Sequence, residues 1–242
     1  ERALHGDNGR KLVQVDRTSR YVDTIEQKPP VPGQNVVLTI DAHLQSILER
    51  ALSNHVGAAV AIDPNNGDVL ALVSSPGFDP GLFAGRVSAA QYTALLADRC
   101  RPLFNRAIAG QYPLGSVFKL ITSIAGLESG VISSNTVFQD PGVFQLGAMR
   151  VRKFRRLRHG EVDLLKALRV SCNTFFCNYA VPIGITRLNA AAQLFHLGDK
   201  TGIELPEEAA GLLPDPIWKR SRLREPWFPG DTVNLSIGHG YL

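Results

Sequence analysis

The chain has 242 residues, of which 44% are hydrophobic and 20% are charged, so it can bury one sizeable core. Its net charge of +4 is too mild to indicate a dedicated nucleic-acid partner. Three cysteines are too few for a disulfide framework, and no apolar run reaches the roughly 18 residues that a transmembrane helix needs. We therefore expect one main globular domain.

The first 35 residues are polar, and a Lys-Pro-Pro-Val-Pro-Gly stretch occupies positions 28–33. Proline fixes the backbone dihedral φ and has no backbone N–H, so this stretch favours an extended linker over a helix. We place a domain boundary near Gly33. Residues 1–35 are then a linker region, and the main domain covers residues 36–242.

A strand, a helix and a hairpin are expected next. Residues 36–40, Val-Val-Leu-Thr-Ile, are rich in β-branched side chains, which favours a short strand. The carboxylate of Asp41 can cap a helix over residues 42–54. Two apolar runs, residues 57–63 and 68–74, then flank Pro-Asn-Asn-Gly. Because Asn-Gly supplies the positive φ angles of a tight turn, these runs predict a β-hairpin.

Most of the remaining chain has helical periodicity. A loop over residues 110–115 leads into a helix over residues 116–128, whose apolar side chains recur at helical spacing until Gly130 ends it. Hairpin strands followed by consecutive helices predict an α+β domain, in which an antiparallel sheet packs against a helical cluster. The further helices that we expect cover residues 88–97, 162–170, 174–180 and 186–197.

Ser116 and Lys119 could form a catalytic pair. A serine in the first turn of a helix and a lysine three residues later lie on one face, within reach of each other. Burial disfavours the charged form of lysine, so a lysine in a cleft can accept the proton of the serine hydroxyl. The positive potential of a helix N-terminus favours an oxyanion nearby. The pattern indicates an acyl-transfer nucleophile and its base.

The spacing alone does not establish this pair. Average residue usage gives about one Ser-x-x-Lys by chance in a chain of this length. Ser116 as a helix cap and Lys119 as a solvated side chain explain the same four residues. The choice between the two interpretations depends on the surrounding sequence.

Six segments in a fixed order supply that context. They are residues 61–74, 78–80, 103–107, 112–119, 171–176 and 234–241. Together they resemble class B penicillin-binding proteins, and most closely the elongation-type members, from Gly57 to the end of the chain. Residues 38–45 resemble the family's approach to its catalytic domain, and residues 1–35 resemble the end of its non-catalytic pedestal region.

This resemblance implies the penicillin-binding-protein and serine β-lactamase-like transpeptidase fold, truncated here at both ends. It implies Ser116 as the acylated nucleophile and Lys119 as the general base. Ser171 and Asn173 match the second motif of the family. Their chemistry fits, because Ser171 can relay a proton between Lys119 and the leaving amine, while the Asn173 amide can hydrogen-bond the lysine and the substrate.

Two other motif matches are interpreted as structural. Residues 133–135, Ser-Ser-Asn, repeat the second motif but lack an apolar helix behind them, which is typical of a turn. Residues 200–202, Lys-Thr-Gly, have the letters of the family's third motif, yet they precede residues 211–214, whereas the third motif follows that stretch. We therefore expect the chain to end, at Leu242, before the substrate-binding strand. One oxyanion donor is then missing, which could leave the chain alone inactive, since such a donor contributes about 2.7–4 kcal/mol.

A metal site is the second site that the resemblance suggests. Asp140, His159 and Cys172 occupy positions that resemble three zinc ligands of some elongation-type members, and zinc accepts oxygen, nitrogen and sulfur ligands. Residues 153–155, Lys-Phe-Arg, stand where a fourth carboxylate is expected and cannot ligate, although Asp163 could substitute. Zinc at this site and Cys172 as a small buried residue both stay open. Acyl transfer itself needs no cofactor.

Basic side chains concentrate in residues 150–158, and such clusters can contact phosphate. Phe154 is the one aromatic residue among them, and no recognised nucleic-acid module accompanies them. A solvated loop near the cleft or a contact with anionic lipid is favoured instead. We expect no nucleic-acid partner.

The family resemblance implies a peptidoglycan D,D-transpeptidase that forms an acyl-enzyme at Ser116 and cross-links stem peptides. β-Lactams would acylate the same serine. It also implies an extracytoplasmic, periplasmic location, with an anchor in the cytoplasmic membrane and membrane-embedded cell-wall elongation proteins as partners through an N-terminal part outside this chain. Two alternatives stay open, a serine β-lactamase or β-lactam sensor on the same fold, and a non-catalytic scaffold that keeps the fold for partner binding.

Overall fold

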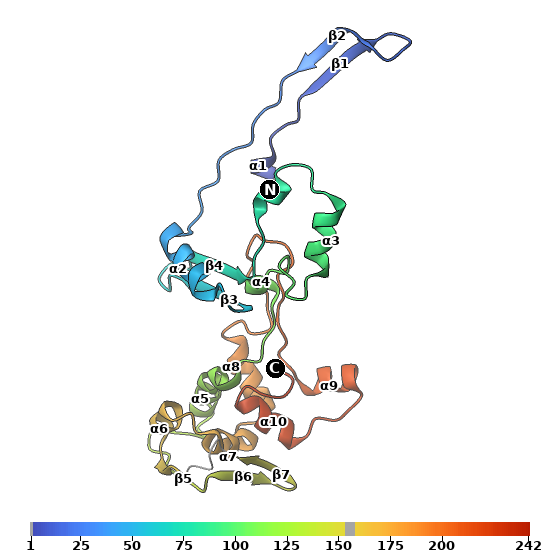
Figure 1. Cartoon of the computed structure of the whole chain (residues 1–242). Helices are drawn as coiled ribbons and strands as arrows, with labels where there is room; N and C mark the ends of the chain where they lie inside the picture. The colour runs from blue at the N-terminus through green and yellow to red at the C-terminus, as the bar shows by residue number, and fades with distance from the viewer. Residues whose placement is uncertain (1, 153–157) are drawn as a thin grey trace. The chain divides into compact units, whose positions relative to one another are not determined.

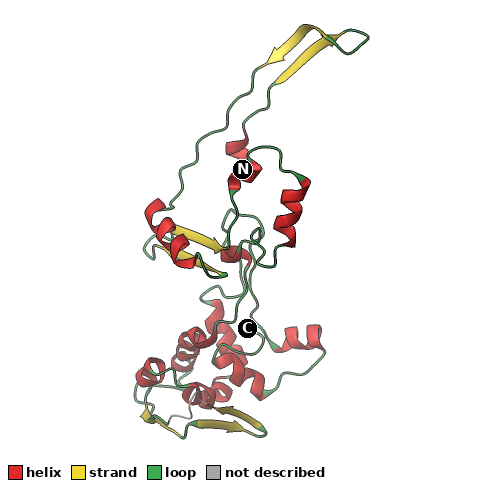
Figure 2. Cartoon of the chain, in the orientation of Figure 1, coloured by secondary structure: helices red, strands yellow, loops and turns green. Residues whose placement is uncertain are grey.

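The computed structural model describes residues 2–152 and 158–242, and the chain divides into two compact units, residues 1–103 and 104–242. Each unit combines helices with short antiparallel strand pairs (Figures 1 and 2). The predicted α+β class is therefore confirmed. Residues 153–155, where a fourth metal ligand was sought, and most of the basic stretch lie outside the described residues.

The first unit opens with α1 (Arg2–His5) and an antiparallel hairpin of β1 (Arg10–Val15) and β2 (Tyr21–Lys28). Almost every side chain of this hairpin is exposed. Arg10 donates to the carboxylate of Glu26 across the hairpin, at 2.7 Å. Neither face of the hairpin is buried, so its sequence shows no apolar alternation that would indicate strands. For this reason residues 1–35 were predicted to be a linker without strands.

No strand forms over residues 36–40, contrary to the prediction. The hydroxyl of Thr39 donates to the carbonyl of Val69 at 2.6 Å, and the amide of Asp41 donates to the carbonyl of Leu70 at 2.9 Å. A single backbone bond does not make a ladder. Residues 36–40 therefore contact β4 through one side-chain and one backbone hydrogen bond without joining its sheet.

The helix and the hairpin that follow this segment are confirmed. Asp41 caps α2 (Ala42–Leu52) by accepting from two backbone amides of its first turn. Strands β3 (Gly57–Ile62) and β4 (Val69–Ser75) pair in antiparallel fashion. Gly67 in their turn has a φ of +82°, which only glycine and a few other residues adopt readily.

The remaining parts of the first unit are η1 (Pro80–Phe83), a 3-10 turn, and α3 (Ala89–Ala97). Ser88 begins α3 with a capping box, because its hydroxyl accepts from the amide of Gln91 and the Gln91 side chain accepts from the amide of Ser88. The helix predicted over residues 88–97 is therefore confirmed.

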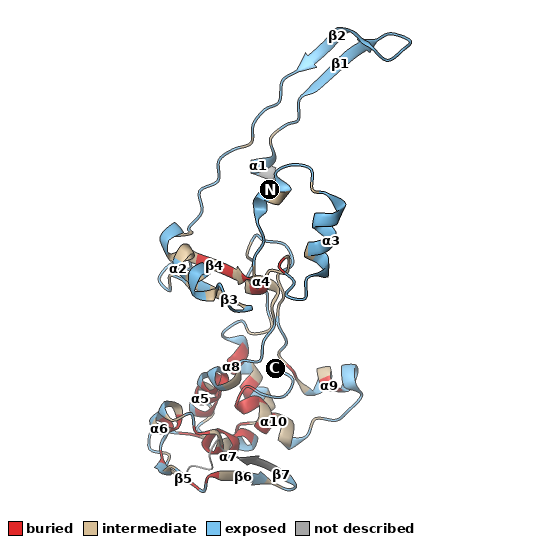
Figure 3. Cartoon of the chain, in the orientation of Figure 1, coloured by how far each residue is buried: buried red, intermediate tan, exposed pale blue. Residues whose placement is uncertain are grey.

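The second unit is a helical cluster with two strand pairs, β5–β8 and β6–β7. Helix α7 lies in its core, and α5 and α10 pack against it (Figure 3). The buried Phe175 and Phe176 of α7 contact each other edge to face. In chain order the elements are α4 (Arg106–Ala109), η2 (Gly115–Phe118), α5 (Lys119–Glu128), β5 (Phe138–Asp140), β6 (Val143–Leu146), β7 (Met149–Arg152), β8 (Gly160–Val162), α6 (Leu164–Arg169), α7 (Asn173–Ile183), α8 (Ile185–Gln193), α9 (Pro216–Leu223) and α10 (Pro229–Ser236).

Five predicted helices differ from the observed ones in extent. Helix α2 ends at Leu52 and not at residue 54, and α7 covers Asn173–Ile183 and not residues 174–180. The helix predicted over residues 116–128 starts as the 3-10 turn η2 and becomes α-helical at Lys119. Helix α6 begins at Leu164 and not at residue 162, because Val162 pairs with β5 and Asp163 caps the helix. Helix α8 ends at Gln193, four residues before the predicted end, and turns follow it. Local helical spacing cannot show where a strand partner or a turn takes over.

No helix in the part of the chain that the structure describes is both long enough and apolar enough to cross a membrane.

Candidate active site

Ser116 and Lys119 meet at the junction of η2 and α5. The side-chain nitrogen of Lys119, Nζ, lies 3.1 Å from the hydroxyl oxygen of Ser116, Oγ. Lys119 is only 1% exposed, whereas Ser116 is exposed. The hydroxyl is therefore accessible from solvent, while the amine beside it is withdrawn from water.

Ser171 and Asn173 complete a ring of oxygen atoms around the lysine. Nζ of Lys119 donates to Oγ of Ser171 at 2.8 Å, to the carbonyl of Ser171 at 3.0 Å, and to Oδ1 of Asn173. Oγ of Ser171 in turn donates to Oγ of Ser116 at 3.0 Å. The four residues that the sequence singled out thus form one hydrogen-bonded cluster in the structure.

The backbone at Ser171 accounts for this geometry. Ser171 follows α6, and its φ of +50° lies in the left-handed region, which is unusual for a residue with a side chain. Such a conformation costs about 1–3 kcal/mol and persists where surrounding bonds hold it. The amide of Ser171 donates to Leu168, and that of Cys172 donates to Ala167 at 2.8 Å. This turn brings both the hydroxyl and the carbonyl of Ser171 to Lys119.

An aromatic ring that no sequence motif indicated lies beside this cluster. The ring centre of Phe176 lies 5.6 Å from Nζ of Lys119, within the range of a cation–π contact. Phe176 is three residues after Asn173 on α7, so both side chains lie on one face of that helix. The spacing of three residues between Asn173 and Phe176 is the sequence signal from which a ring beside Lys119 could have been predicted.

Asp140, His159 and Cys172 also come together, and their ligand atoms all lie within 4.8 Å of one another. Oδ2 of Asp140 accepts from the backbone amide of His159 at 2.9 Å, and Oδ1 accepts from the hydroxyl of Thr174 at 2.6 Å. Oxygen, nitrogen and sulfur donors in a largely buried setting fit zinc. Asp163 caps α6 and does not join this group among the described residues.

The two look-alike motifs lie in irregular backbone, and their hydroxyls make local hydrogen bonds. The hydroxyl and the amide of Thr201 both donate to a carboxylate oxygen of Glu208 at 2.6 Å. The side-chain hydrogen bond from Thr201 is the largest cause that lowers the pKa of Glu208. In the other match, Oγ of Ser133 accepts from the amide of Asn135 at 3.3 Å. Their hydroxyls are engaged in these local bonds.

Comparisons with known proteins identify the family of this chain. Residues 57–242 match the family model for the penicillin binding protein transpeptidase domain. The peptidoglycan D,D-transpeptidase MrdA of Escherichia coli K12 is 40% identical over all of this chain, which spans 38% of that relative. The crystal structure of Pseudomonas aeruginosa PBP2 in complex with WCK 5153 is 42% identical, with a TM-score of 0.82, over 88% of this chain and 49% of that one. The complex between PBP2 and MreC from Helicobacter pylori is 31% identical, with a TM-score of 0.86, over 99% of this chain and 45% of that one.

Proposed function

Because the chain belongs to the penicillin-binding-protein transpeptidase family, we propose that it contains the acylation centre of a peptidoglycan D,D-transpeptidase. The chain spans well under half the length of the curated relatives that it matches, 38% in one case. The observation that carries the proposal is the position of Lys119, whose amine lies within hydrogen-bonding distance of both hydroxyls, that of Ser116 and that of Ser171.

In this proposal Ser116 is the nucleophile. Lys119, as the neutral amine, accepts the proton of Ser116 while Oγ attacks the carbonyl carbon of the penultimate D-alanine of a stem peptide. The bond from that carbon to the nitrogen of the terminal D-alanine breaks, and the leaving nitrogen takes a proton that Ser171 relays from Lys119. An ester on Ser116 remains. The amine of a second stem then attacks this ester, and the proton returns along the same path.

The side-chain amide of Asn173 would position Lys119 and the substrate relative to each other. Its oxygen already bonds the lysine, and its nitrogen is left to donate to a peptide carbonyl. A β-lactam presents the same acyl carbon in a strained ring amide, so it would acylate Ser116 and stay attached if no acceptor amine can reach the ester.

The test is to incubate the full-length protein with a fluorescent penicillin and to map the label by proteolysis and mass spectrometry. We expect one adduct that survives denaturing electrophoresis and lies on the peptide containing Ser116. A label on another peptide would remove Ser116 from its role. Rapid loss of the label would favour the β-lactamase alternative, and no label at all would favour the scaffold.

The partners and the location follow from the same reasoning. The relative from Helicobacter pylori was solved in a complex with MreC, and peptidoglycan stems lie outside the cytoplasmic membrane. We therefore propose that the full-length protein works in the extracytoplasmic space together with cell-wall elongation proteins. Co-purification with the MreC protein of the same cell tests this, and its failure under conditions where both proteins are folded would count against that partner.

We also propose a zinc ion, held by Asp140, His159 and Cys172. Cys172 directly follows Ser171, so a metal bound to it would stiffen the turn before α7. The metal would be structural and would take no part in acyl transfer. Cys177 is a matched control, since it is equally buried but outside the group. Burial raises the pKa of Cys177 to about 12, so its thiol stays protonated near neutral pH and is a poor metal ligand.

We expect purified protein to carry about one zinc ion per chain. The Cys172→Ser variant should lose that zinc, while Cys177→Ser should keep it, as measured by metal analysis after dialysis. Zinc-free wild-type protein, or an equal loss from both variants, would contradict the proposal and leave Cys172 as a small buried side chain.

A further inference from the structure

A backbone contact from the end of the chain fixes the turn that carries the nucleophile. The amide of Gly115, the residue before Ser116, donates to the carbonyl of Gly238 at 3.0 Å. Gly115 has a φ of +55°, so its backbone is already in a conformation that few residues adopt. The position of Ser116 therefore depends on a residue far away in the sequence.

Gly238 fits this contact only because it has no side chain. Its φ is +71°, and a Cβ built on it would overlap the oxygen, carbon and nitrogen of Gly115. A Cβ on Gly115 itself would meet open space. The steric restriction thus lies on Gly238, and any side chain there must displace the turn before the nucleophile.

A second bond joins the same segment to the helix that carries the base. The buried Thr122, one turn after Lys119 on α5, donates to the carbonyl of Ser236 at 2.8 Å. Helix α10 also packs against α7, whose first residue is Asn173. Helix α10 and the two residues after it therefore contact the turn before the serine, the helix after the lysine, and the helix of the second motif.

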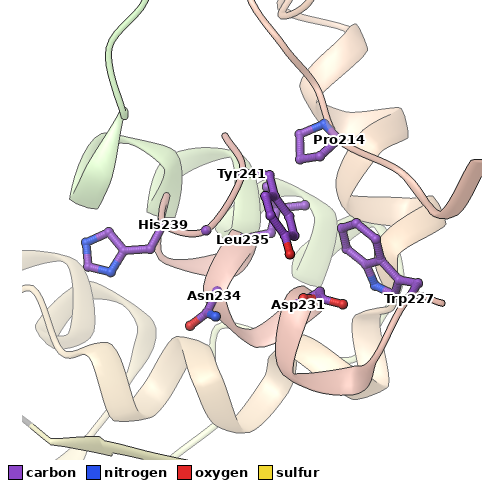
Figure 4. A pocket seen from close by; sticks show the side chains of 8 residues that line it. Pro214, Trp227, Asp231, Asn234, Leu235, His239 and Tyr241 are labelled. Atoms are coloured by element: carbon purple, nitrogen blue, oxygen red, sulfur yellow. The ribbon is translucent and has the colours of Figure 1, made fainter. Parts of the chain in front are cut away.

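The start of α10 is anchored as well. Asp231 accepts from the amide of Phe228 and from Nζ of Lys219, each at 2.7 Å. The side chain of Lys219 is 3% exposed, so this ion pair is largely shielded from water. Figure 4 shows Asp231 on α10 beside a cavity that Trp227 and Tyr241 also line. With its start held in this way, α10 can present Gly238 to the nucleophile turn in one orientation.

From these contacts we infer that Gly238 is a positioning residue for Ser116, acting through the backbone of Gly115. The inference rests on the proposed function, since it concerns the rate at which Ser116 is acylated. A displacement of about 1 Å at a reacting group can reduce a rate by about 10²-fold. Gly238→Ala should therefore slow the acylation step by about 10²-fold and change the preceding non-covalent binding of the β-lactam much less.

The control variant is Gly240→Ala. Gly240 also has a left-handed φ, +84°, but a Cβ there would meet only Cβ of Asn234, at 3.3 Å. Both variants carry the same kind of backbone strain, and only Gly238→Ala presses on Gly115. Stopped-flow acylation of the full-length protein separates the first-order acylation constant from the dissociation constant of the non-covalent complex. Thermal unfolding is measured in parallel.

We expect both variants to unfold at lower temperature and only Gly238→Ala to acylate slowly. Equal acylation constants for Gly238→Ala and the wild type, or an equal loss in Gly240→Ala, would overturn the inference. If the wild type itself is not acylated, the proposed function fails instead.

Thr122 provides a second test if Gly238→Ala does not fold. Thr122→Val removes the donor to Ser236 while keeping the shape of the side chain, and Thr122→Ser keeps the donor. We expect Thr122→Val to acylate slowly and Thr122→Ser to restore most of the rate. Wild-type acylation by Thr122→Val would count against a positioning role for the end of α10.

Discussion

Replacing Ser116 with alanine is expected to abolish labelling by fluorescent penicillin. Removal of a serine nucleophile lowers the rate by roughly 10⁶-fold where it has been measured in a serine hydrolase. Ser171 also lies beside Lys119, but in the proposed mechanism its hydroxyl relays a proton and does not attack. An alanine at position 116 removes the hydroxyl at the start of the helix that carries Lys119, which is the hydroxyl that attacks in the proposed mechanism.

Stability should hardly change in this variant. Ser116 is exposed, and without its hydroxyl Nζ of Lys119 still donates to both oxygens of Ser171 and to Asn173, so we expect the free energy of unfolding to change by about 1 kcal/mol or less. Ser133→Ala is the matched control, because that exposed serine lies in the second Ser-x-Asn match and serves a turn. The measurements are label incorporation with time and urea unfolding. Undiminished labelling of Ser116→Ala would end the acyl-transfer account.

The features that the sequence predicted well are those that neighbouring residues determine. Asp41 caps α2 because its carboxylate meets amides two and three residues ahead. The Asn-Gly turn forms the β3–β4 hairpin because glycine tolerates the positive φ at Gly67. The spacing of Ser116 and Lys119 likewise brings their side chains together across a single turn.

The features that the sequence could not predict depend on distant partners. Residues 36–40 have strand propensity, yet Thr39 uses its side chain on Val69 and the ladder does not form. The hairpin β1–β2 lacks a buried face and therefore lacks a periodic signal. The clash that a Cβ on Gly238 would make with Gly115 exists only in three dimensions.

The cluster around Lys119 combines features of both kinds, those set by neighbouring residues and those set by distant partners. The sequence motifs indicated which residues form it. They did not indicate that Ser171 contacts Lys119 through its carbonyl as well as through its hydroxyl. That carbonyl points to the lysine because the backbone of Ser171 is left-handed, and no propensity assigns such a φ to serine. The family resemblance implies the role of each side chain, whereas the distances between their atoms depend on the folded backbone.

Replacing Lys119 with methionine is expected to slow acylation by about 10²–10⁴-fold, the usual contribution of a general base. It should also destabilise the protein, because methionine fills the buried space but donates to none of the oxygens of Ser171 and Asn173. These hydrogen bonds are part-buried, and each contributes about 0.5–1.5 kcal/mol to stability. Lys119→Met should therefore change both the acylation constant and the midpoint of urea unfolding.

Lys200→Met separates these effects from the general loss of a lysine. Lys200 is exposed and belongs to the Lys-Thr-Gly match, in which Thr201 bonds Glu208. We expect this variant to acylate and to unfold like the wild type. Lys119→Arg refines the comparison, because arginine keeps the charge and the donors but cannot give up a proton near neutral pH. If Lys119→Arg acylates at the wild-type rate, Lys119 acts through its positive charge and not as the base; if it is as slow as Lys119→Met, the proton transfer is what the cluster provides.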